Sequence, residues 1–520
     1  MAKDYLTEFL PDLAEFREKT MQFHNKKLSV AEYKGFSGGF GSYAERGGDT
    51  HMLRLRMAGG QLTKERLKFI VDTCDRYEIK KMKLTTCQSI QLHHLKAQDL
   101  CEIIEAAWKA GMISRGGGGD FPRNVMASPL SGVQPGEYLD VLPYARAAGE
   151  YMMGFIRSVK FPRKLKVAFS NSPANEVHAT FRDLGFTANP DGTLDVYAAG
   201  GLGSNPKIGL KVAQNIEADN VLYYIKAMVN TFVTHGNYEN RGRARTRYMQ
   251  ETLGTDGFIQ EYKNQLDNVF ATEELKIHPE IPEIKKARLG TANGELSSPI
   301  SDRRIFPQKQ NGLYAVFYQP PGGEFTPAKA RELYSAIKDM GDVEIRLTPQ
   351  EGLYVIHCTA REAEQILALT SDSAKTIFET SVACVGAAVC QVGLGNSPAL
   401  LKDCIEAVRK ENFADGVLPK IHISGCPSSC GTHQTAKIGF RGAMKQTPDG
   451  PKPAFAIFVG GCEKQGKEQL ADTGKAIAVE DIPHFLVELG QIISGEKTTY
   501  DYWISTNQKT LKHLIAKYTG

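Results

Sequence analysis

Apolar and polar residues alternate with regular periods in residues 52–94. Apolar side chains spaced at i, i+3, i+4 and i+7 predict a helix with one buried face, at Leu67, Ile70, Val71 and Cys74. Farther along, Ile90 and Leu92 alternate with polar residues, as in a half-buried strand. The segment is therefore predicted to form a strand, a Gly-Gly turn, a helix and a second strand.

The same pattern occurs a second time in residues 315–357. A constant shift of 263 residues, from Gly59 to Gly322, aligns the two copies without a gap. Thr63 and Thr326 precede the two helices and suit the N-cap position, where a hydroxyl accepts a backbone N–H. Each copy resembles a ferredoxin-like half-domain.

A second repeat follows each of these copies. Residues 166–173 match residues 420–427 at a shift of 254, and residues 197–201 match residues 457–461 at a shift of 260. The chain is therefore predicted to be an α+β protein with an internally duplicated plan, whose parts we name A1, B1, A2 and B2. A1 (1–120) and A2 (300–380) are predicted to pair as ferredoxin-like half-domains, and B1 (121–299) and B2 (381–520) to be α/β cofactor-binding domains.

The duplication exposes differences between its two halves. B2 has Cys426 and Cys430 where B1 has Ser172 and Glu176, and A1 has Arg54 where A2 has Phe317. One half thus carries candidate metal ligands and the other supplies positive charge. Because ligand sites commonly form between domains, we expect the active site at the junction of A1, B1 and B2.

Charge and hydropathy exclude some classes of function. A formal net charge of +4 over 520 residues is too weak to indicate nucleic-acid binding. The first 19 residues are charged throughout and contain no apolar signal-peptide core, and no stretch reaches the roughly 20 apolar residues that span a membrane. We expect a cytoplasmic protein with no membrane partner.

The ten cysteines fall into groups with different expected roles. Four lie in apolar periodic segments and are predicted to be small buried residues: Cys74, Cys87, Cys101 and Cys358. Four others form two tight pairs among Gly and Pro, namely Cys384 with Cys390 and Cys426 with Cys430. Four thiolates suit an iron–sulfur cluster or a zinc ion, and structural cysteines are the third possibility. The five-residue gap of the first pair is unusual for zinc and favours the cluster.

The spacing C-x5-C followed by G-C-P-x-x-C is similar to the signature of the siroheme-containing sulfite and nitrite reductases. The A-B-A-B duplication is also the architecture of that family, so the resemblance covers most of the chain. It implies that all four paired cysteines hold one [4Fe-4S] cluster. It also implies that Cys430 bridges the cluster to the siroheme iron.

The resemblance extends to basic residues that would bind a small oxyanion. Met52–Arg56 resembles the strand that supplies the first arginine, which points to Arg54, and Arg123 lies in the segment that supplies the second. Residues 161–166 resemble the segment that supplies two lysines, Lys164 and Lys166. Arginine binds oxyanions through paired donors, and lysine can also deliver a proton.

Siroheme carries eight carboxylates and needs a basic pocket. Arg163, Arg245 and Arg247 are candidates for pairing with them, although Arg245 and Arg247 would also suit a solvated helix face. Gln91 and His93 match polar positions of the strand that contacts the heme, and His93 would equally suit a satisfied strand histidine. Two residues depart from the family pattern: Cys87 replaces an arginine, and Ser428 replaces an asparagine.

The expected reaction is the six-electron reduction of sulfite to sulfide, because the second lysine, Lys166, is typical of sulfite-reducing members. Nitrite reduction to ammonia at the same centre is the alternative. No G-x-G-x-x-G follows a strand and opens a helix, so we expect a separate electron donor, either ferredoxin or a flavoprotein subunit. Two other functions are possible: a non-catalytic iron–sulfur or zinc subunit, and a related cobalamin-pathway oxygenase without siroheme. Neither would need Arg54, Arg123, Lys164 and Lys166 together.

Overall fold

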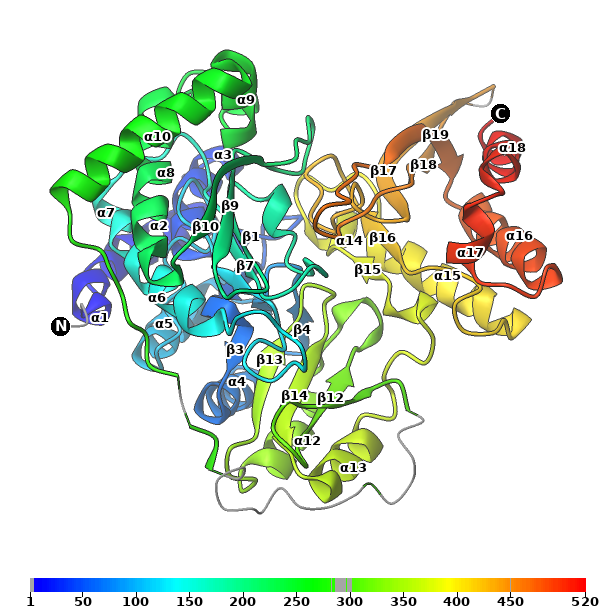
Figure 1. Cartoon of the computed structure of the whole chain (residues 1–520), viewed down its shortest axis with the longest axis horizontal. Coiled ribbons are helices and arrows are strands. Elements are labelled where there is room, and N and C mark those ends of the chain that lie inside the picture. Colours follow the sequence, from blue (N-terminus) through cyan, green and yellow to red (C-terminus); the bar gives the residue numbers. More distant parts are fainter. Residues whose placement is uncertain (1–3, 282, 286–295, 297–301, 449) are drawn as a thin grey trace.

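The computed structural model describes residues 4–281, 283–285, 296, 302–448 and 450–520. Its first sheet belongs to A1 and has the strand order β1-β2-β5-β4 (Figure 1). The strands are β1 (Ser42–Ala44), β2 (His51–Leu55), β4 (Lys81–Leu84) and β5 (Ile90–Leu95). The helices of this part are α1 (Tyr5–Phe9), α2 (Asp12–His24), α3 (Val30–Ser37), α4 (Lys64–Arg76) and α5 (Ala97–Lys109).

A2 repeats this arrangement element by element. Its strands are β11 (Ile305–Pro307), β12 (Tyr314–Tyr318), β13 (Glu344–Leu347) and β14 (Leu353–Cys358), and its helices are α12 (Pro327–Ile337) and α13 (Ala360–Leu369). Strands β1, β2, β4 and β5 fall on β11, β12, β13 and β14 at the shift of 263 residues. The hydroxyls of Thr63 and Thr326 both cap their helices as predicted.

A1 and A2 pack as one unit. The short strand β3 (Gln61–Leu62) leaves A1 and completes the A2 sheet, whose order is β11-β12-β14-β13-β3. One hydrophobic core joins both parts, because Leu53 and Leu55 belong to the same cluster of buried residues as Val316 and Tyr318. The two half-domains therefore pack against each other through a shared core.

B1 and B2 share a second topology. Each sheet has three parallel strands followed by two antiparallel ones, in the orders β6-β7-β8-β9-β10 and β15-β16-β17-β18-β19. The B1 strands are β6 (Met126–Ala127), β7 (Val167–Ser170), β8 (Leu184–Ala188), β9 (Leu194–Ala198) and β10 (Leu210–Ile216). The B2 strands are β15 (Val382–Ala383), β16 (Ile421–Ser424), β17 (Ile438–Thr447), β18 (Gly450–Val459) and β19 (Asp472–Ala478). Phe169 and Phe186 stack inside B1, and Ile423 and Phe440 occupy the matching positions of the B2 core.

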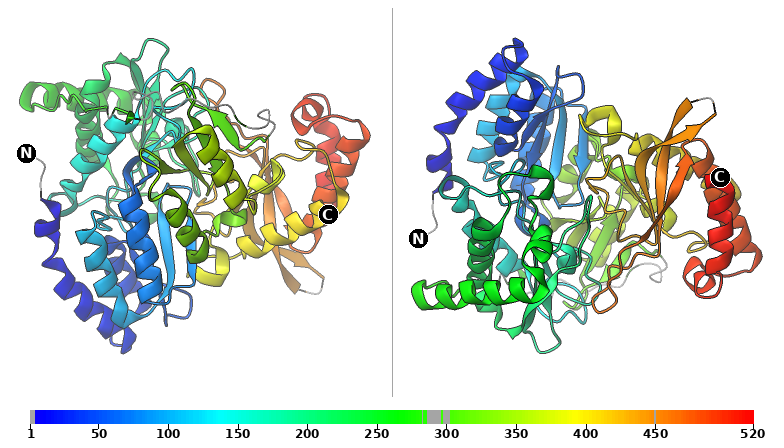
Figure 2. Two further views of the ribbon diagram at one scale, coloured as in Figure 1. Left: turned by 90° about the horizontal axis from the view of Figure 1, so that it is seen from below. Right: turned by 90° about the horizontal axis from the view of Figure 1, so that it is seen from above.

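Helices cover the B sheets. The two ends of the chain lie far apart (Figure 2). The helices of B1 are α6 (Leu142–Met153), α7 (Phe155–Ser158), α8 (Val221–His235), α9 (Met249–Thr252) and α10 (Gly254–Thr272). Those of B2 are α14 (Gly386–Val389), α15 (Ser397–Glu411), α16 (Asp481–Gly495), α17 (Tyr500–Ile504) and α18 (Gln508–Thr519). The α+β class with a duplicated plan is confirmed, whereas the predicted boundaries of the three domains stay a prediction. No helix in the described part of the chain is both long and apolar enough to cross a bilayer.

A buried ion pair joins A1, A2 and B2. Lys83 of β4 donates to the Glu351 carboxylate at 3.1 Å and to the carbonyl of Gly322, and both charged side chains are almost fully buried. The same carboxylate accepts the backbone N–H of Ala383, the residue before the first paired cysteine. Burial raises the pKa of Glu351 to about 7, and Lys83 opposes that shift. This pair fixes the start of the first cysteine loop against the A1–A2 unit.

We predict that Lys83→Met lowers the free energy of unfolding by about 3–5 kcal/mol, because it leaves a buried carboxylate without its partner. A carboxyl with a raised pKa in the folded state favours folding at low pH, so the loss should be larger at pH 8 than at pH 5. Urea denaturation at both pH values measures it. Lys68→Met is the control, because Lys68 forms only an exposed pair with Asp72. Equal, small effects in both variants would contradict the role of Lys83.

Candidate functional site

The two cysteine pairs lie at one edge of the B2 sheet. Cys384 follows β15, and Cys426 and Cys430 follow β16, which runs parallel to β15. The carboxyl ends of parallel strands meet at the same edge, and the backbone N–H of Gly425 donates to the Cys384 sulfur at 3.1 Å. Cys390 ends the short helix α14. Figure 1 shows α14, β15 and β16 facing the B1 sheet across the middle of the molecule.

Glycine allows the two cysteine loops to approach closely. A Cβ atom on Gly425 would lie 2.6 Å from the carbonyl oxygen of Gly395, which is closer than a real Cβ atom comes. Gly386, inside the first pair, has a φ of 63°, which side chains rarely adopt. The Gly-rich composition of both pairs therefore has a packing cause, since backbone N–H groups are brought to the sulfurs.

A1 holds both cysteine pairs from the other side. The hydroxyl of Thr86 donates to the carbonyl of Cys430 at 2.7 Å. The guanidinium of Arg46 donates to the carbonyls of Cys390 at 3.1 Å and of Gly393 at 2.7 Å. The expected junction of A1 with the cysteine loops of B2 is thus present.

The two cysteine pairs are brought together at one edge of the B2 sheet, where their thiols could bind a metal centre. Among the described residues, no group of three or more His, Cys, Asp or Glu side chains is placed to hold a single metal ion. Two thiol pairs on facing loops, with an N–H directed at one sulfur, fit a cluster with a metal at each of several corners.

The Cys430 side chain is accessible to solvent, yet many protein atoms surround its thiol. Those surroundings, together with Cys384 and Cys426, raise the pKa of Cys430 to about 11, and Lys164 and Lys166 act in the opposite direction. A metal would relieve the unfavourable ionisation of this thiol, because a coordinated thiolate is deprotonated.

Two arginines from A1 and B1 meet on a loop of glycines. Arg54 of β2 donates to the carbonyl of Gly117 at 2.5 Å, and Arg123 donates to the same carbonyl at 2.9 Å. A second donor of Arg123 reaches the carbonyl of Gly119 at 2.8 Å, and its Nε is buried with no partner among the described residues. Burial and the nearby Arg54 lower the pKa of Arg123 to about 10. The two guanidinium groups are therefore brought together, with donors left over.

Lys164 and Lys166 extend this region of positive charge from the two arginines to the cysteines. Burial, followed by Arg245, Lys166 and Arg123, lowers the pKa of Lys164 well below its usual value. Lys166, with its pKa lowered chiefly by burial, interacts with Cys430 as Lys164 does. The four residues predicted to contact substrate thus form one basic cluster that reaches Cys430.

The prediction that Cys87 is a small buried residue without a chemical role is wrong. Its side chain is half-buried in the turn between β4 and β5, and Lys166 Nζ donates to its sulfur at 3.3 Å. Burial opposes ionisation of the thiol, but Lys166, Arg182 and Arg54 lower the pKa of Cys87 to about 6. Hydropathy alone could not reveal this environment, because two of the three basic neighbours, Lys166 and Arg182, come from B1. Cys74, Cys101 and Cys358 are buried as predicted.

The arginines expected to contact siroheme differ in how far they are already paired. Arg163 forms an ion pair with Asp120, and Arg245 binds Asp183 at 2.9 Å. Arg247 is buried, and its Nε and Nη1 have no partner in the described part of the chain. The alternative of a solvated helix face for Arg245 and Arg247 is wrong, because both lie in the basic cluster or beside it.

The two residues of β5 that are predicted to contact siroheme lie on the face that carries Arg54. Gln91 is the cross-strand neighbour of Arg54, and alternation places His93 on the same face. His93 Nδ1 lies 2.7 Å from the Glu45 carboxylate, whereas its Nε2 is buried with no partner among the described residues. The histidine is therefore fixed in orientation and keeps one ring nitrogen available.

Two further residues of the site were missed in the sequence. The Tyr43 hydroxyl accepts the N–H of Gly119 at 2.7 Å, and although burial opposes ionisation, Arg123, Arg54 and Arg163 lower the pKa of Tyr43. Arg182 is buried beside Cys87, and its Nη2 has no partner in the described ranges. The comparison of the repeats contains the signal for both, because A2 has Phe306 at the position of Tyr43 and B2 has Ala436 at that of Arg182.

The cluster fits the two cofactors that the resemblance implies. Buried guanidinium N–H groups normally find acceptors, yet three arginines of the cluster keep donors that have no partner among the residues the structure describes: Arg123, Arg182 and Arg247. A large group with many carboxylates would supply those acceptors, and the thiols of two pairs would hold a cluster next to it. The residues present therefore fit both siroheme and a [4Fe-4S] cluster.

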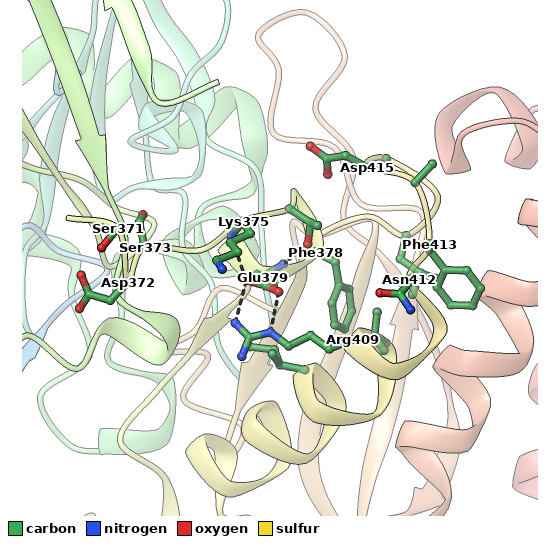
Figure 3. A pocket seen from close by; sticks show the side chains of 16 residues that line it. Ser371, Asp372, Ser373, Lys375, Phe378, Glu379, Arg409, Asn412, Phe413 and Asp415 are labelled. Atoms are coloured by element: carbon green, nitrogen blue, oxygen red, sulfur yellow. Dashed lines mark hydrogen bonds and ion pairs between the residues drawn. The ribbon is translucent and has the colours of Figure 1, made fainter. Parts of the chain in front are cut away.

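An open cavity of about 690 Å³ lies elsewhere, between A2 and α15 (Figure 3). Its charged groups largely neutralise one another, because Arg409 binds Glu379 through two nitrogens at 2.7 and 2.9 Å. None of the predicted site residues lines it. The basic cluster, rather than this cavity, is the candidate site.

Comparison with known proteins identifies similar families. Residues 118–270 match the family model described as the nitrite and sulphite reductase 4Fe-4S domain. Residues 43–109 and 306–371 match that of the nitrite/sulfite reductase ferredoxin-like half domain. The first match contains Arg123 and both lysines of the cluster, and the others coincide with A1 and A2.

Individual relatives cover most of the chain. A ferredoxin–nitrite reductase of Synechococcus elongatus is 28% identical over 84% of this chain and 85% of its own length. An assimilatory ferredoxin-dependent nitrite reductase of Haloferax mediterranei is 26% identical over 87% and 81%. The solved structure of the Mycobacterium tuberculosis NirA protein has the same fold, with a TM-score of 0.73, 21% identity and coverage of 94% of this chain and 92% of that one.

We predict that replacing any one of the paired cysteines with serine lowers bound iron and acid-labile sulfide together, because all four sulfurs hold one cluster. Cys384→Ser is the most informative variant, since Cys384 also accepts the N–H of Gly425. Colorimetric iron and sulfide assays on the purified proteins measure the loss, and Cys101→Ala is the control for replacement of a buried thiol. Wild-type iron and sulfide in all four serine variants would show that the assignment is wrong.

Proposed function

Because this chain belongs to the nitrite and sulfite reductase family, we propose that it reduces nitrite to ammonia. The chain is an oxidoreductase of that family. The observation that carries the proposal is that Lys164 and Lys166 lie against Cys430, with Arg123 next to Lys164, because it places anion-binding groups beside a candidate metal ligand. The relatives described above are named nitrite reductases. The expectation of sulfite as the main substrate is not confirmed, and nitrite agrees better with those names.

The cofactors are siroheme and a [4Fe-4S] cluster. We propose that Cys384, Cys390, Cys426 and Cys430 hold the cluster, and that Cys430 is also the ligand that links it to siroheme. Bound together, the two groups supply the electrons that the reaction consumes, while the protein supplies binding, orientation and charge. Arg163, Arg245, Arg247, Gln91 and His93 are the proposed contacts to siroheme.

The basic residues have separate proposed tasks. Arg54 and Arg123 hold the anion, because two planar guanidinium groups on the same glycine loop present donors in fixed directions. Lys164 is the proposed proton source, since its lowered pKa makes proton release at neutral pH easier. Each oxygen that leaves nitrite needs protons to depart as water, so a lysine beside the anion serves both binding and protonation.

Ferredoxin is the proposed electron donor, because the relatives from Synechococcus elongatus and Haloferax mediterranei are named as ferredoxin enzymes. A flavoprotein subunit as donor stays a prediction. The expected cytoplasmic location also stays a prediction.

We predict that the purified enzyme has a higher kcat/KM for nitrite than for sulfite. Steady-state assays with a chemically reduced low-potential dye, with ammonia and sulfide measured as products, give both values. Adding reduced ferredoxin in place of the dye tests the donor separately. A higher kcat/KM for sulfite would reverse the choice of substrate.

Arg54→Ala is predicted to lower kcat/KM for nitrite by about ten- to a hundredfold, because it removes a charge-assisted contact to the anion. It should lower sulfite turnover as well, since a guanidinium binds either anion. Arg361→Ala, at an exposed position of α13, is the matched control and should leave both rates unchanged. Wild-type kinetics in Arg54→Ala, with siroheme content intact, would remove Arg54 from the site.

A further inference from the structure

Cys87 is the one thiol outside the paired cysteines that the structure places in the basic cluster, among the described residues. It lies in the turn that connects β4 to β5, and Thr86 beside it donates to the carbonyl of Cys430. The turn is therefore anchored to the loop that carries Cys430, although Cys87 is not itself one of the paired cysteines.

The position of the Cys87 sulfur is fixed by its own backbone. The amide of Asn124 donates to the carbonyls of Cys87 at 2.9 Å and of Met57 at 2.9 Å. The next residue, Gln88, has a φ of 52° and donates through its side chain to Ala127 and Leu347, both at 2.8 Å. A turn tied to its surroundings by this many hydrogen bonds cannot easily move its sulfur away from Lys166.

The lysine is held equally firmly. The backbone N–H of Lys166 donates to the buried carboxylate of Asp183 at 2.8 Å, just before β7 begins. From there the side chain extends so that Nζ donates to Cys87 Sγ at 3.3 Å. Arg182, with one buried donor unsatisfied in the described part of the chain, lies close enough to interact with the same sulfur.

We propose that Cys87 determines which anion the site prefers, by holding the Lys166 ammonium on its own sulfur. The inference rests on the proposed function and names a residue that tunes its selectivity. Cys87 acts through Lys166 and is a positioning residue, with no contact to the substrate required.

The physical reason is the charge of the two anions. Sulfite carries up to two negative charges and nitrite carries one, so a change of one positive charge in the site alters the attraction for sulfite more strongly. Lys166 alone would favour sulfite. An ionised Cys87 beside Lys166 and Arg182 cancels part of that charge, in keeping with the pKa of about 6 of this thiol. The pair therefore leaves a site better matched to a singly charged anion.

The test compares the ratio of kcat/KM for sulfite to kcat/KM for nitrite across five proteins: wild type, Cys87→Ala, Cys87→Ser, Lys166→Met and the double variant Cys87→Ala/Lys166→Met. Cys87→Ala is expected to raise the ratio about tenfold, because it frees the ammonium. Cys87→Ser should raise it less, since a hydroxyl keeps the hydrogen bond but not the charge. In the Lys166→Met background, Cys87→Ala should have little further effect. Cys101→Ala, which changes a buried thiol in α5, is the control.

A second measurement does not depend on turnover. The rate at which iodoacetamide alkylates Cys87 at pH 7, followed by mass spectrometry of the peptide, is expected to fall about tenfold in Lys166→Met, because the thiolate loses its partner. An unchanged alkylation rate would overturn the proposal. So would a Cys87→Ala effect on the ratio that is absent, or equally large with and without Lys166. A wild-type preference for sulfite would instead overturn the proposed function. The coupling between Cys87 and Lys166 would still be measured by the same set of variants.

Discussion

The positive charge gathered around Cys430 is the constraint on which the rest of the structure depends. Placing cations side by side away from water is costly, and burial together with mutual repulsion lowers the pKa of Lys164 and Arg123. Part of the charge is balanced locally, by the carboxylate of Asp183 against Arg245 and by the thiol of Cys87 against Lys166. The remainder has guanidinium donors directed at no protein acceptor among the described residues. Such a surplus is stable only where a ligand with several negative charges belongs, which is why cofactor and substrate binding share one place.

Duplication explains how the chain supports this unbalanced site. The duplication creates a second junction between B1 and B2, related to the first by pseudo-twofold symmetry. There Glu176 of B1 corresponds to Cys430 of B2, and Lys420 of B2 corresponds to Lys166 of B1. There the charges are matched: a Glu463 carboxylate oxygen lies 2.7 Å from His178 Nε2, and against the effect of burial Lys420 and His178 lower the pKa of Glu463 to about 2. One pseudo-equivalent junction therefore holds B1 to B2 with internal ion pairs, while the other is left for ligands. Gln434 of B2 reinforces the same contact through two hydrogen bonds to Gly203 of B1, at 2.7 and 2.9 Å.

The elements that follow hydropathy could be predicted from sequence. The repeats aligned at a shift of 263 residues coincide with real strands, because periodicity reports which face of an element is buried. The convergence of Arg54, Arg123 and the lysines was expected from resemblance, and the structure places them together. Ion pairs between residues far apart in the sequence could not be predicted from it. Asp120 forms an ion pair with Arg163, and Asp183 forms one with Arg245. Nothing in the sequence around either carboxylate indicates which arginine it binds. The environment of Cys87 could not be predicted for the same reason, since its sulfur accepts a hydrogen bond from a lysine 79 residues away.

The most direct test of the account is the visible absorption spectrum of the purified protein, produced with iron and siroheme available. The central claim is that the basic cluster holds siroheme next to a cluster bound by the paired cysteines. The account predicts strong Soret and red bands from siroheme, superimposed on the broad absorption of the iron–sulfur cluster. The broad shoulder of a cluster alone, in protein with full iron and sulfide content, would contradict it.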